Sequence, residues 1–151
     1  MPDDAPVLPA DNKSYRYGDG LFETMKVVQG QISLAALHFE RLFSGLKILG
    51  YKVPLLLVPA KLQEEIQLLC KKNKCEKLAR VRLSVSRGNG GIDDETDELQ
   101  YLIECWPLSE SSNQLNEQGY SIEVFPDARK SCDVYSNLKS ANYLPYIMAA
   151  R

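Results

Sequence analysis

One segment, residues 77–86, limits the possible fold more than any other part of the chain. Val81, Leu83 and Val85 alternate there with arginine and serine side chains. An apolar residue at every second position places all of them on one side of an extended chain, which is the pattern of a half-buried β-strand. The segment therefore predicts a sheet with one face in a core and one polar face.

Further strands are predicted from neighbouring patterns. Residues 21–28 are expected to form a strand that continues through a hairpin turn at Gln29-Gly30 into a short return strand. Residues 99–106 form another expected strand, which is antiparallel to residues 77–86 if a hairpin connects the two. These assignments favour an antiparallel sheet.

Two helices are predicted as well. Residues 34–49 are expected to form the first, because Ser33 is a suitable N-cap and Gly50 stands at the C′ position. Residues 59–72 are expected to form the second, in which Pro59 fits the first turn. The predicted fold class is α+β: a small domain with an antiparallel sheet and two helices.

The chain is expected to continue beyond that domain. Residues 1–108 would form the small α+β domain, and the polar stretch 109–117 would form a linker. Residues 118–151 would begin a second, α/β domain, with a strand at 120–125 and a helix from about Asn142. Because that helix is still apolar where the sequence ends, we expect these residues to be the N-terminal part of a longer protein.

The composition excludes several classes of function. With 44% hydrophobic residues, 25% charged residues and a net charge of −2, the chain is typical of a soluble globular protein. Its basic residues are scattered, so nucleic-acid binding is not expected, and no apolar run approaches the roughly 18 residues of a membrane span. The four cysteines form no Cys-x-x-Cys pair and are accompanied by one histidine. We therefore expect no metal site, and reduced thiols in a cytoplasmic protein.

Lys139 is the first candidate for chemistry. It stands just before an apolar, helix-like run, residues 143–150, and no aspartate or glutamate lies near it in sequence. A lysine held among apolar groups has a lowered pKa, because burial disfavours its charged form. The neutral amine is a nucleophile that can form a Schiff base with a carbonyl compound. The alternative is a solvated lysine at the start of a helix.

Arg41 is the second candidate. On the helix expected at 34–49, the predicted apolar stripe consists of Leu34, Leu37, Ile48 and Leu49. Arg41 falls inside that stripe in projection, and a buried guanidinium needs an anion. The anion could be a phosphate, which suits the planar fork of arginine, or the side chain could reach water or a glutamate. His38, beside the stripe, is expected to be a structural histidine.

Four motifs in one order carry a family resemblance. They are residues 16–24 (RYGDGLFET), 38–42 (HFERL), 86–88 (SRG) and 137–144 (NLKSANYL). Together they resemble the class IV aminotransferases, the pyridoxal-phosphate (PLP) enzymes of fold type IV. The resemblance covers nearly the whole chain. The glutamate and threonines that complete the cofactor site in this family would lie beyond Arg151, so these residues alone would form an incomplete site.

The resemblance implies roles for five side chains. Lys139 would be the Schiff-base lysine and the proton shuttle, and Arg41 would bind the phosphate of PLP. Tyr143 would lie against the cofactor, and Tyr17 and Phe22 would line the substrate pocket. The PLP ring would act as the electron sink for a carbanion at the α carbon of the substrate.

The resemblance also suggests a reaction. The spacing from Lys139 to Asn142 is similar to that of the lyase and D-amino-acid branches, and residues 86–91 (SRGNGG) are closest to the aminodeoxychorismate lyases, although Ile92 replaces an arginine that some of those carry. The expected reaction is cleavage of aminodeoxychorismate, an amino-acid-like small molecule, to 4-aminobenzoate and pyruvate by a homodimer. The alternatives are a branched-chain or D-amino-acid transaminase and a non-catalytic module derived from the fold.

Overall fold

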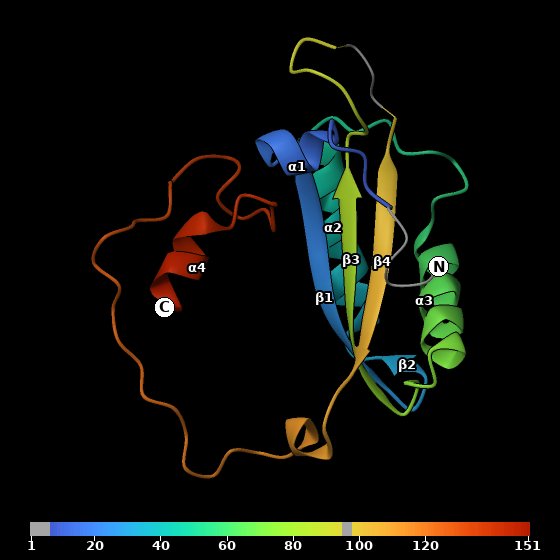
Figure 1. The fold of residues 1–151 in the computed structure, drawn as a ribbon, viewed down its shortest axis with the longest axis vertical. Coiled ribbons are helices and arrows are strands. Elements are labelled where there is room, and N and C mark those ends of the chain that lie inside the picture. Colours follow the sequence, from blue (N-terminus) through green and yellow to red (C-terminus); the bar gives the residue numbers. More distant parts are fainter. Residues whose placement is uncertain (1–6, 95–97) are drawn as a thin grey trace.

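The computed structural model describes residues 7–94 and 98–151, so residues 1–6 and 95–97 of the predicted small domain lie outside the described part. Its sheet has four strands in the order β2-β1-β3-β4, and every neighbouring pair is antiparallel (Figure 1). The α+β class with an antiparallel sheet is thereby confirmed. The elements are α1 (Lys13–Tyr17), β1 (Gly20–Val28), β2 (Gln31–Ile32), α2 (Ala35–Ile48), α3 (Pro59–Lys72), β3 (Leu78–Ser86), β4 (Gln100–Pro107), the 3-10 turn η1 (Glu110–Asn113) and α4 (Leu144–Ala149).

The two central strands, β1 and β3, pair along their whole length. The register runs from Gly20 opposite Ser86 to Val28 opposite Leu78. The alternation in β3 is confirmed, because its apolar residues are almost completely buried and its arginines lie on the other face. The pairing of β3 with β4 confirms the expected hairpin arrangement. The sheet thus has one face in the core and one face that is largely polar.

The helices α2 and α3 cover the core face of the sheet. In Figure 1, α2 lies behind β1 and β3, and α3 lies beside β4. Leu42 and Leu46 of α2 pack in the same core as Leu62 and Ile66 of α3, and none of the four is more than 2% exposed. The second helix, Pro59–Lys72, has the predicted bounds.

The predicted apolar stripe of α2 is wrong. Leu34, Leu37 and Ile48 are 69%, 60% and 53% exposed. The helix buries a different stripe because apolar residues at positions 35, 39, 42, 46 and 49 follow the 3–4 spacing of one helix face. The buried residues of α2 are Phe39, Leu42, Gly45 and Leu46.

Both ends of α2 can be compared with the prediction. The N-cap is Leu34, in the left-handed conformation with φ of 56°, and no side chain caps the helix, so the prediction of Ser33 as N-cap is wrong. Gly50 has φ of 68° and occupies the predicted C′ position, where glycine adopts the left-handed conformation most easily. Gly45 allows α2 to approach β1, since a Cβ there would lie 2.8 Å from Leu21 Cδ1.

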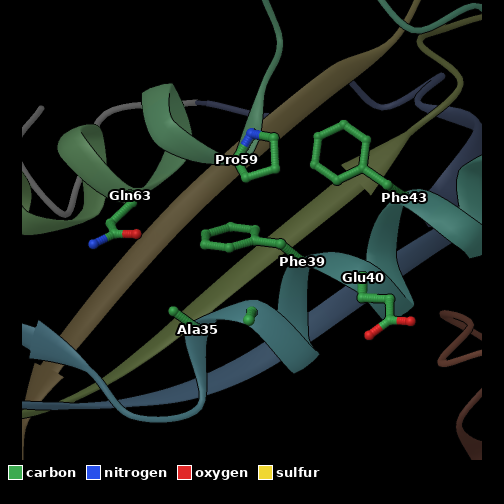
Figure 2. A pocket seen from close by; sticks show the side chains of 7 residues that line it. Ala35, Phe39, Glu40, Phe43, Pro59 and Gln63 are labelled. Carbon is green, nitrogen blue, oxygen red and sulfur yellow. The ribbon is translucent and has the colours of Figure 1, made fainter.

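A shallow groove of about 550 Å³ lies between α2 and α3 (Figure 2). The rings of Phe39, Phe43 and Pro59 line its apolar part. None of the residues that line this groove lines the cavity that contains Lys139.

The strand predicted at 120–125 is wrong. Tyr120, Ile122 and Val124 are 86%, 96% and 85% exposed, and the segment pairs with no strand in residues 7–94 and 98–151. Alternation alone does not make a strand, because each strand needs a neighbour for its backbone hydrogen bonds. The division into domains at 108 and 117 stays a prediction.

The last helix starts two residues later than predicted, at Leu144, with Tyr143 as its N-cap residue and Pro145 in its first turn. Among the described residues, no helix has both the length and the apolar character needed to cross a membrane.

Candidate active site

The segment that carries Lys139 joins the sheet at the start of β1. The Phe22 N–H donates to the Lys139 carbonyl at 2.9 Å, and the Ala141 N–H donates to the Gly20 carbonyl at 2.9 Å. These bonds flank an antiparallel bridge between Leu21 and Ser140. Figure 1 shows the red C-terminal segment returning to this end of β1. Backbone pairing thus fixes the lysine against a central strand of the core.

The Lys139 amine lies over an aromatic ring. Its Nζ is 4.5 Å from the centroid of the Phe22 ring. Burial lowers the pKa of Lys139, the Glu23 carboxylate partly opposes that shift, and the Arg41 and Arg82 guanidinium groups add to it. A lowered pKa increases the fraction of neutral amine, which is the nucleophilic form.

Aromatic side chains form a wall beside this amine. The Phe22 and Tyr143 rings meet edge to face with 5.3 Å between centroids, and Tyr143 stacks on Tyr146 at 4.7 Å. On the same ring of Phe22, the Arg82 guanidinium lies 4.0 Å from the centroid. Phe22 is only 4% exposed, so it contacts Lys139 and Tyr143 from inside the fold.

A cavity of about 780 Å³ opens beside this wall. Arg41, Lys139 and Tyr143, three of the predicted site residues, all line it. The lining also includes two further cations and one carboxylate: Arg129, Lys130 and Asp133. The excess of positive charge makes the cavity suitable for an anionic ligand.

Arg41 finds its anion in a buried carboxylate. Its Nε donates to Glu23 Oε1 at 2.7 Å and its Nη2 donates to Glu23 Oε2, while His38 Nδ1 lies 2.8 Å from the same Oε2. The hydrogen bonds to Glu23 raise the pKa of Arg41. Glu23 is 1% exposed, whereas the Arg41 side chain is 48% exposed. The ion pair adjoins the cavity, because Arg41 also lines it.

A second ion-pair network holds the start of β1 in place. Arg87 Nε donates to Asp19 Oδ2 at 2.9 Å, and Arg87 Nη2 donates to the Leu49 carbonyl at 2.7 Å. The guanidinium also lies 4.2 Å from the centroid of the Tyr51 ring. Two of the motifs, 16–24 and 86–88, are thus joined to the end of α2 beside the position where the Lys139 segment enters the sheet.

Comparison with known protein families identifies the family of this chain. The family model described as amino-transferase class IV matches residues 20–151. The chain belongs to the class IV aminotransferase family. The predicted resemblance is confirmed. A search of curated protein sequences found no significant match.

Several solved structures of lyases and aminotransferases have a similar fold. A protein of Legionella pneumophila, provisionally assigned as a 4-amino-4-deoxychorismate lyase, has a TM-score of 0.72 and 24% identity over 97% of this chain and 52% of its own. The 4-amino-4-deoxychorismate lyase of Pseudomonas aeruginosa has a TM-score of 0.57 and 27% identity over 68% of this chain and 37% of its own. A hypothetical aminotransferase of Mycobacterium tuberculosis in its PLP-bound form has a TM-score of 0.60 and 22% identity over 72% and 37%. The chain therefore spans about half the length of these proteins or less.

The predicted pocket residues Tyr17 and Phe22 do not line the cavity, and Glu23 is a site residue that was not predicted. Phe22 lies against Lys139 and Tyr143, but its role in a substrate pocket stays a prediction. Tyr17 ends α1, is 45% exposed and does not line the cavity beside Lys139, so its role in a substrate pocket stays a prediction. Glu23, the partner of Arg41, was not predicted as a site residue. Its signal was present in the sequence, since it interrupts the apolar side of β1 that Leu21, Met25 and Val27 share.

The network around Arg87 predicts a loss of stability at alkaline pH. Burial first, and then the Asp19 carboxylate, raise the pKa of Tyr51 well above its usual range. As the pH rises, the unfolded chain therefore loses this phenol proton before the folded chain does. The contribution of Tyr51 to the free energy of unfolding is fully present below pH 10 and decreases above it. At pH 11, one unit above the pKa of about 10 of an unfolded tyrosine, we expect Tyr51 to lower the free energy of unfolding by about 1.4 kcal/mol.

Urea unfolding between pH 8 and pH 11 measures this effect. Tyr51→Phe should lack the additional loss, while Tyr135→Phe, at a 58% exposed tyrosine, should keep it. Equal pH slopes for Tyr51→Phe and the wild-type chain would contradict the prediction.

Proposed function

We propose that this chain carries the lysine-bearing part of a PLP-dependent class IV enzyme. The observation that carries the proposal is the position of Lys139: a partly buried amine with a lowered pKa, in a basic cavity that it shares with Arg41. Membership of the family supports the same conclusion. Lys139 is proposed as the catalytic residue, with Arg41 and Tyr143 as cofactor-binding residues.

The residues present fit two groups of the cofactor, its aldehyde and its phosphate. A cavity of about 780 Å³ lies within the range of roughly 300–1,000 Å³ of small-molecule sites. Its amine suits the aldehyde of PLP and its arginine suits the phosphate. The guanidinium has five N–H donors and gives two of them to the Glu23 carboxylate, so donors of the half-exposed head are available to a phosphate.

The side chains around the cavity would divide the work. PLP, when bound, supplies an electron sink for negative charge at the α carbon of a substrate. Lys139 Nζ would take and return the proton at that carbon, which is a task for a group with a pKa near the working pH. The rings of Phe22 and Tyr143 would keep water from the amine. Glu23 would fix the orientation of the Arg41 guanidinium through its hydrogen bonds from the buried side.

Labelling of lysines with PLP tests this proposal. The chain is mixed with PLP, its near-visible absorption is recorded, borohydride is added and the modified peptides are identified by mass. We expect the label on Lys139, and its loss in Lys139→Ala. Lys130→Ala, at another lysine of the same cavity, is the matched control and should label like the wild-type chain. A label shared evenly among Lys130 and surface lysines would refute a special role for Lys139.

For the reaction, we favour aminodeoxychorismate lysis to 4-aminobenzoate and pyruvate. The spacing from Lys139 to Asn142, the segment 86–91 and the similarity to the Pseudomonas aeruginosa lyase support it. Transamination of an amino acid is the second candidate, because the Mycobacterium tuberculosis aminotransferase is also known with α-ketoglutarate and PMP bound. Release of pyruvate from aminodeoxychorismate without any added keto acid would support the lyase. Consumption of 2-oxoglutarate that depends on an amino acid would support the transaminase.

We also propose a homodimer and a domain boundary in 109–117. Light scattering of the chain tests the homodimer, and a monomer at micromolar concentration would contradict it.

Limited proteolysis tests the domain boundary, because residues 109–117 are exposed and cleavage should begin there rather than inside the sheet. The cytoplasmic location stays a prediction.

A further inference from the structure

Three cysteine thiols converge at a place far from Lys139. Cys70 lies in the last turns of α3, Cys75 follows that helix and Cys105 lies on β4. Their sulfur atoms all lie within 4.8 Å of one another, and the Cys75 and Cys105 sulfurs are 3.7 Å apart. Cys70 and Cys75 are 0% and 3% exposed. This cluster could not be predicted from the sequence, because Cys105 is distant along the chain and no Cys-x-x-Cys pair occurs.

The backbone holds two of these thiols in a fixed relation. The Cys75 N–H donates to the Cys70 carbonyl at 3.0 Å, and the Lys74 N–H donates to the Lys71 carbonyl at 3.1 Å. Together these bonds form the Schellman motif that ends many helices, in which the residue after the cap is usually glycine. Here that residue is Lys74 with φ of 55°, a conformation that costs free energy for a side chain other than glycine. The motif places Cys75 directly against Cys70.

Two features around the thiols concern charge: the end of α3 attracts a cation, and nearby lysines offset the charge of thiolate ligands. The thiols lie at the C-terminal end of α3, where the helix dipole is negative and attracts positive charge. The stretch around Cys75 also carries four lysines, whose charge offsets that of thiolates. They are Lys71, Lys72, Lys74 and Lys77.

We propose that Cys70, Cys75 and Cys105 form a three-coordinate site for a soft d10 metal ion, of which Cu(I) is the best match. Thiolate sulfur is the ligand type that selects Cu(I) and zinc. Structural zinc sites use four protein ligands, and no histidine or carboxylate joins the three sulfurs as a ligand group in the described part of the chain. Three ligands of one soft type therefore favour Cu(I) over zinc.

The geometry requires only a small adjustment. With metal–sulfur bonds of about 2.3 Å, three sulfurs around a central ion are roughly 4 Å apart. The observed separations, 3.7 Å for one pair and no more than 4.8 Å for the others, allow this spacing after a movement of less than about 1 Å.

Binding balances without an oxidant. One Cu(I) ion replaces the three thiol protons, three Cu–S bonds form, three protons leave to water, and neither copper nor sulfur changes oxidation state. Metal binding to thiols requires the thiolate form, so the three protons are released when the ion binds. Because each of the three sulfurs is a ligand, the affinity is expected to fall when any one of the three cysteines is removed.

The site is independent of the proposed PLP chemistry. Cys105 is paired with Val81, which faces Met25 of β1, whereas the Lys139 segment joins β1 near Gly20. The Cys105 side chain packs against the core on the helix-covered side of the sheet. Loss of PLP binding would therefore leave copper binding unchanged, and the two proposals can fail separately.

Anaerobic titration of the whole reduced chain tests the proposal. Cu(I) is supplied from a coloured chelator, and the chelator absorbance gives the stoichiometry and affinity. We expect one Cu(I) per chain and an affinity at least tenfold lower for Cys105→Ser. Cys132→Ser, at an exposed thiol outside the cluster, is the control and should bind like the wild-type chain. Circular dichroism checks that each variant is folded.

Several results would overturn the proposal. They are the absence of stoichiometric binding, equal affinity of Cys105→Ser and Cys132→Ser, or formation of a Cys75–Cys105 disulfide in place of a copper complex. If Cys105→Ser does not fold, X-ray absorption of the copper-loaded wild-type chain decides. Three sulfurs at about 2.3 Å would support the site, and any other set of ligands would overturn it.

Discussion

Glu23→Gln should destabilise the chain by about 1.5–3 kcal/mol, the range for loss of hydrogen bonds to a charged group. The carboxylate is 1% exposed and accepts two hydrogen bonds from Arg41, with His38 at 2.8 Å. A glutamine keeps the size of the side chain but offers one acceptor oxygen and an amide group that cannot accept from the guanidinium. Glu23→Ala should cost more, because it also leaves a cavity in the core.

Urea unfolding at pH 7 measures this loss, and two comparisons make it specific. Glu40→Gln, at an exposed glutamate of the same helix as Arg41, should change stability by less than about 0.5 kcal/mol. A double-mutant cycle of Glu23→Gln with Arg41→Gln isolates the pair, and the double variant should be less destabilised than the sum of the single variants. Unchanged stability of Glu23→Gln would show that the buried ion pair contributes nothing.

Arg41→Gln should weaken PLP binding by about tenfold to a hundredfold. The Arg41 head lines the cavity beside Lys139, and a charge-assisted hydrogen bond contributes about 1.5–3 kcal/mol, where about 1.4 kcal/mol is a factor of ten. The Glu23 carboxylate holds this guanidinium in one orientation, so part of the ordering cost of binding is met before the ligand arrives.

Titration with PLP, followed by absorbance, gives the dissociation constants. Arg80→Gln, at an exposed arginine of β3 that does not line the cavity, is the matched control and should bind like the wild-type chain. Inorganic phosphate should compete with PLP in the wild-type chain and have little effect in Arg41→Gln. If Arg41→Gln and Arg80→Gln bound PLP with the same affinity, the proposal that Arg41 binds the phosphate would be wrong.

The helices and strands predicted best are those whose sequence pattern fits only one structure. The helix at Pro59–Lys72 has a proline suited to its start and lysines suited to its end, and its bounds were predicted correctly. The strand Leu78–Ser86 carries an uninterrupted period of two. Where two signals competed, the choice was wrong: the helix at Ala35–Ile48 has apolar residues on two faces, and the face with Phe39 is the buried one.

The candidate site shows the same division. The order of the four motifs was sufficient to predict the family, and the family model matches residues 20–151. Lys139 and Arg41 were predicted to share a site, and the structure brings both to one cavity, but their roles there stay predictions. The segment 120–125 shows the limit of local patterns, because its alternation has no neighbouring strand in the described residues.

The sequence by itself determined the local features of this protein: the period of its strands, the ends of its second helix and the order of the four motifs. The tertiary structure alone decided which distant groups meet. Glu23 under Arg41, the Lys139 segment on the edge of β1, and the three thiols around Cys75 all join residues far apart in the chain. The physical reason is that local patterns report the preference of each segment for burial, whereas hydrogen bonds and ion pairs depend on which segments the fold places side by side.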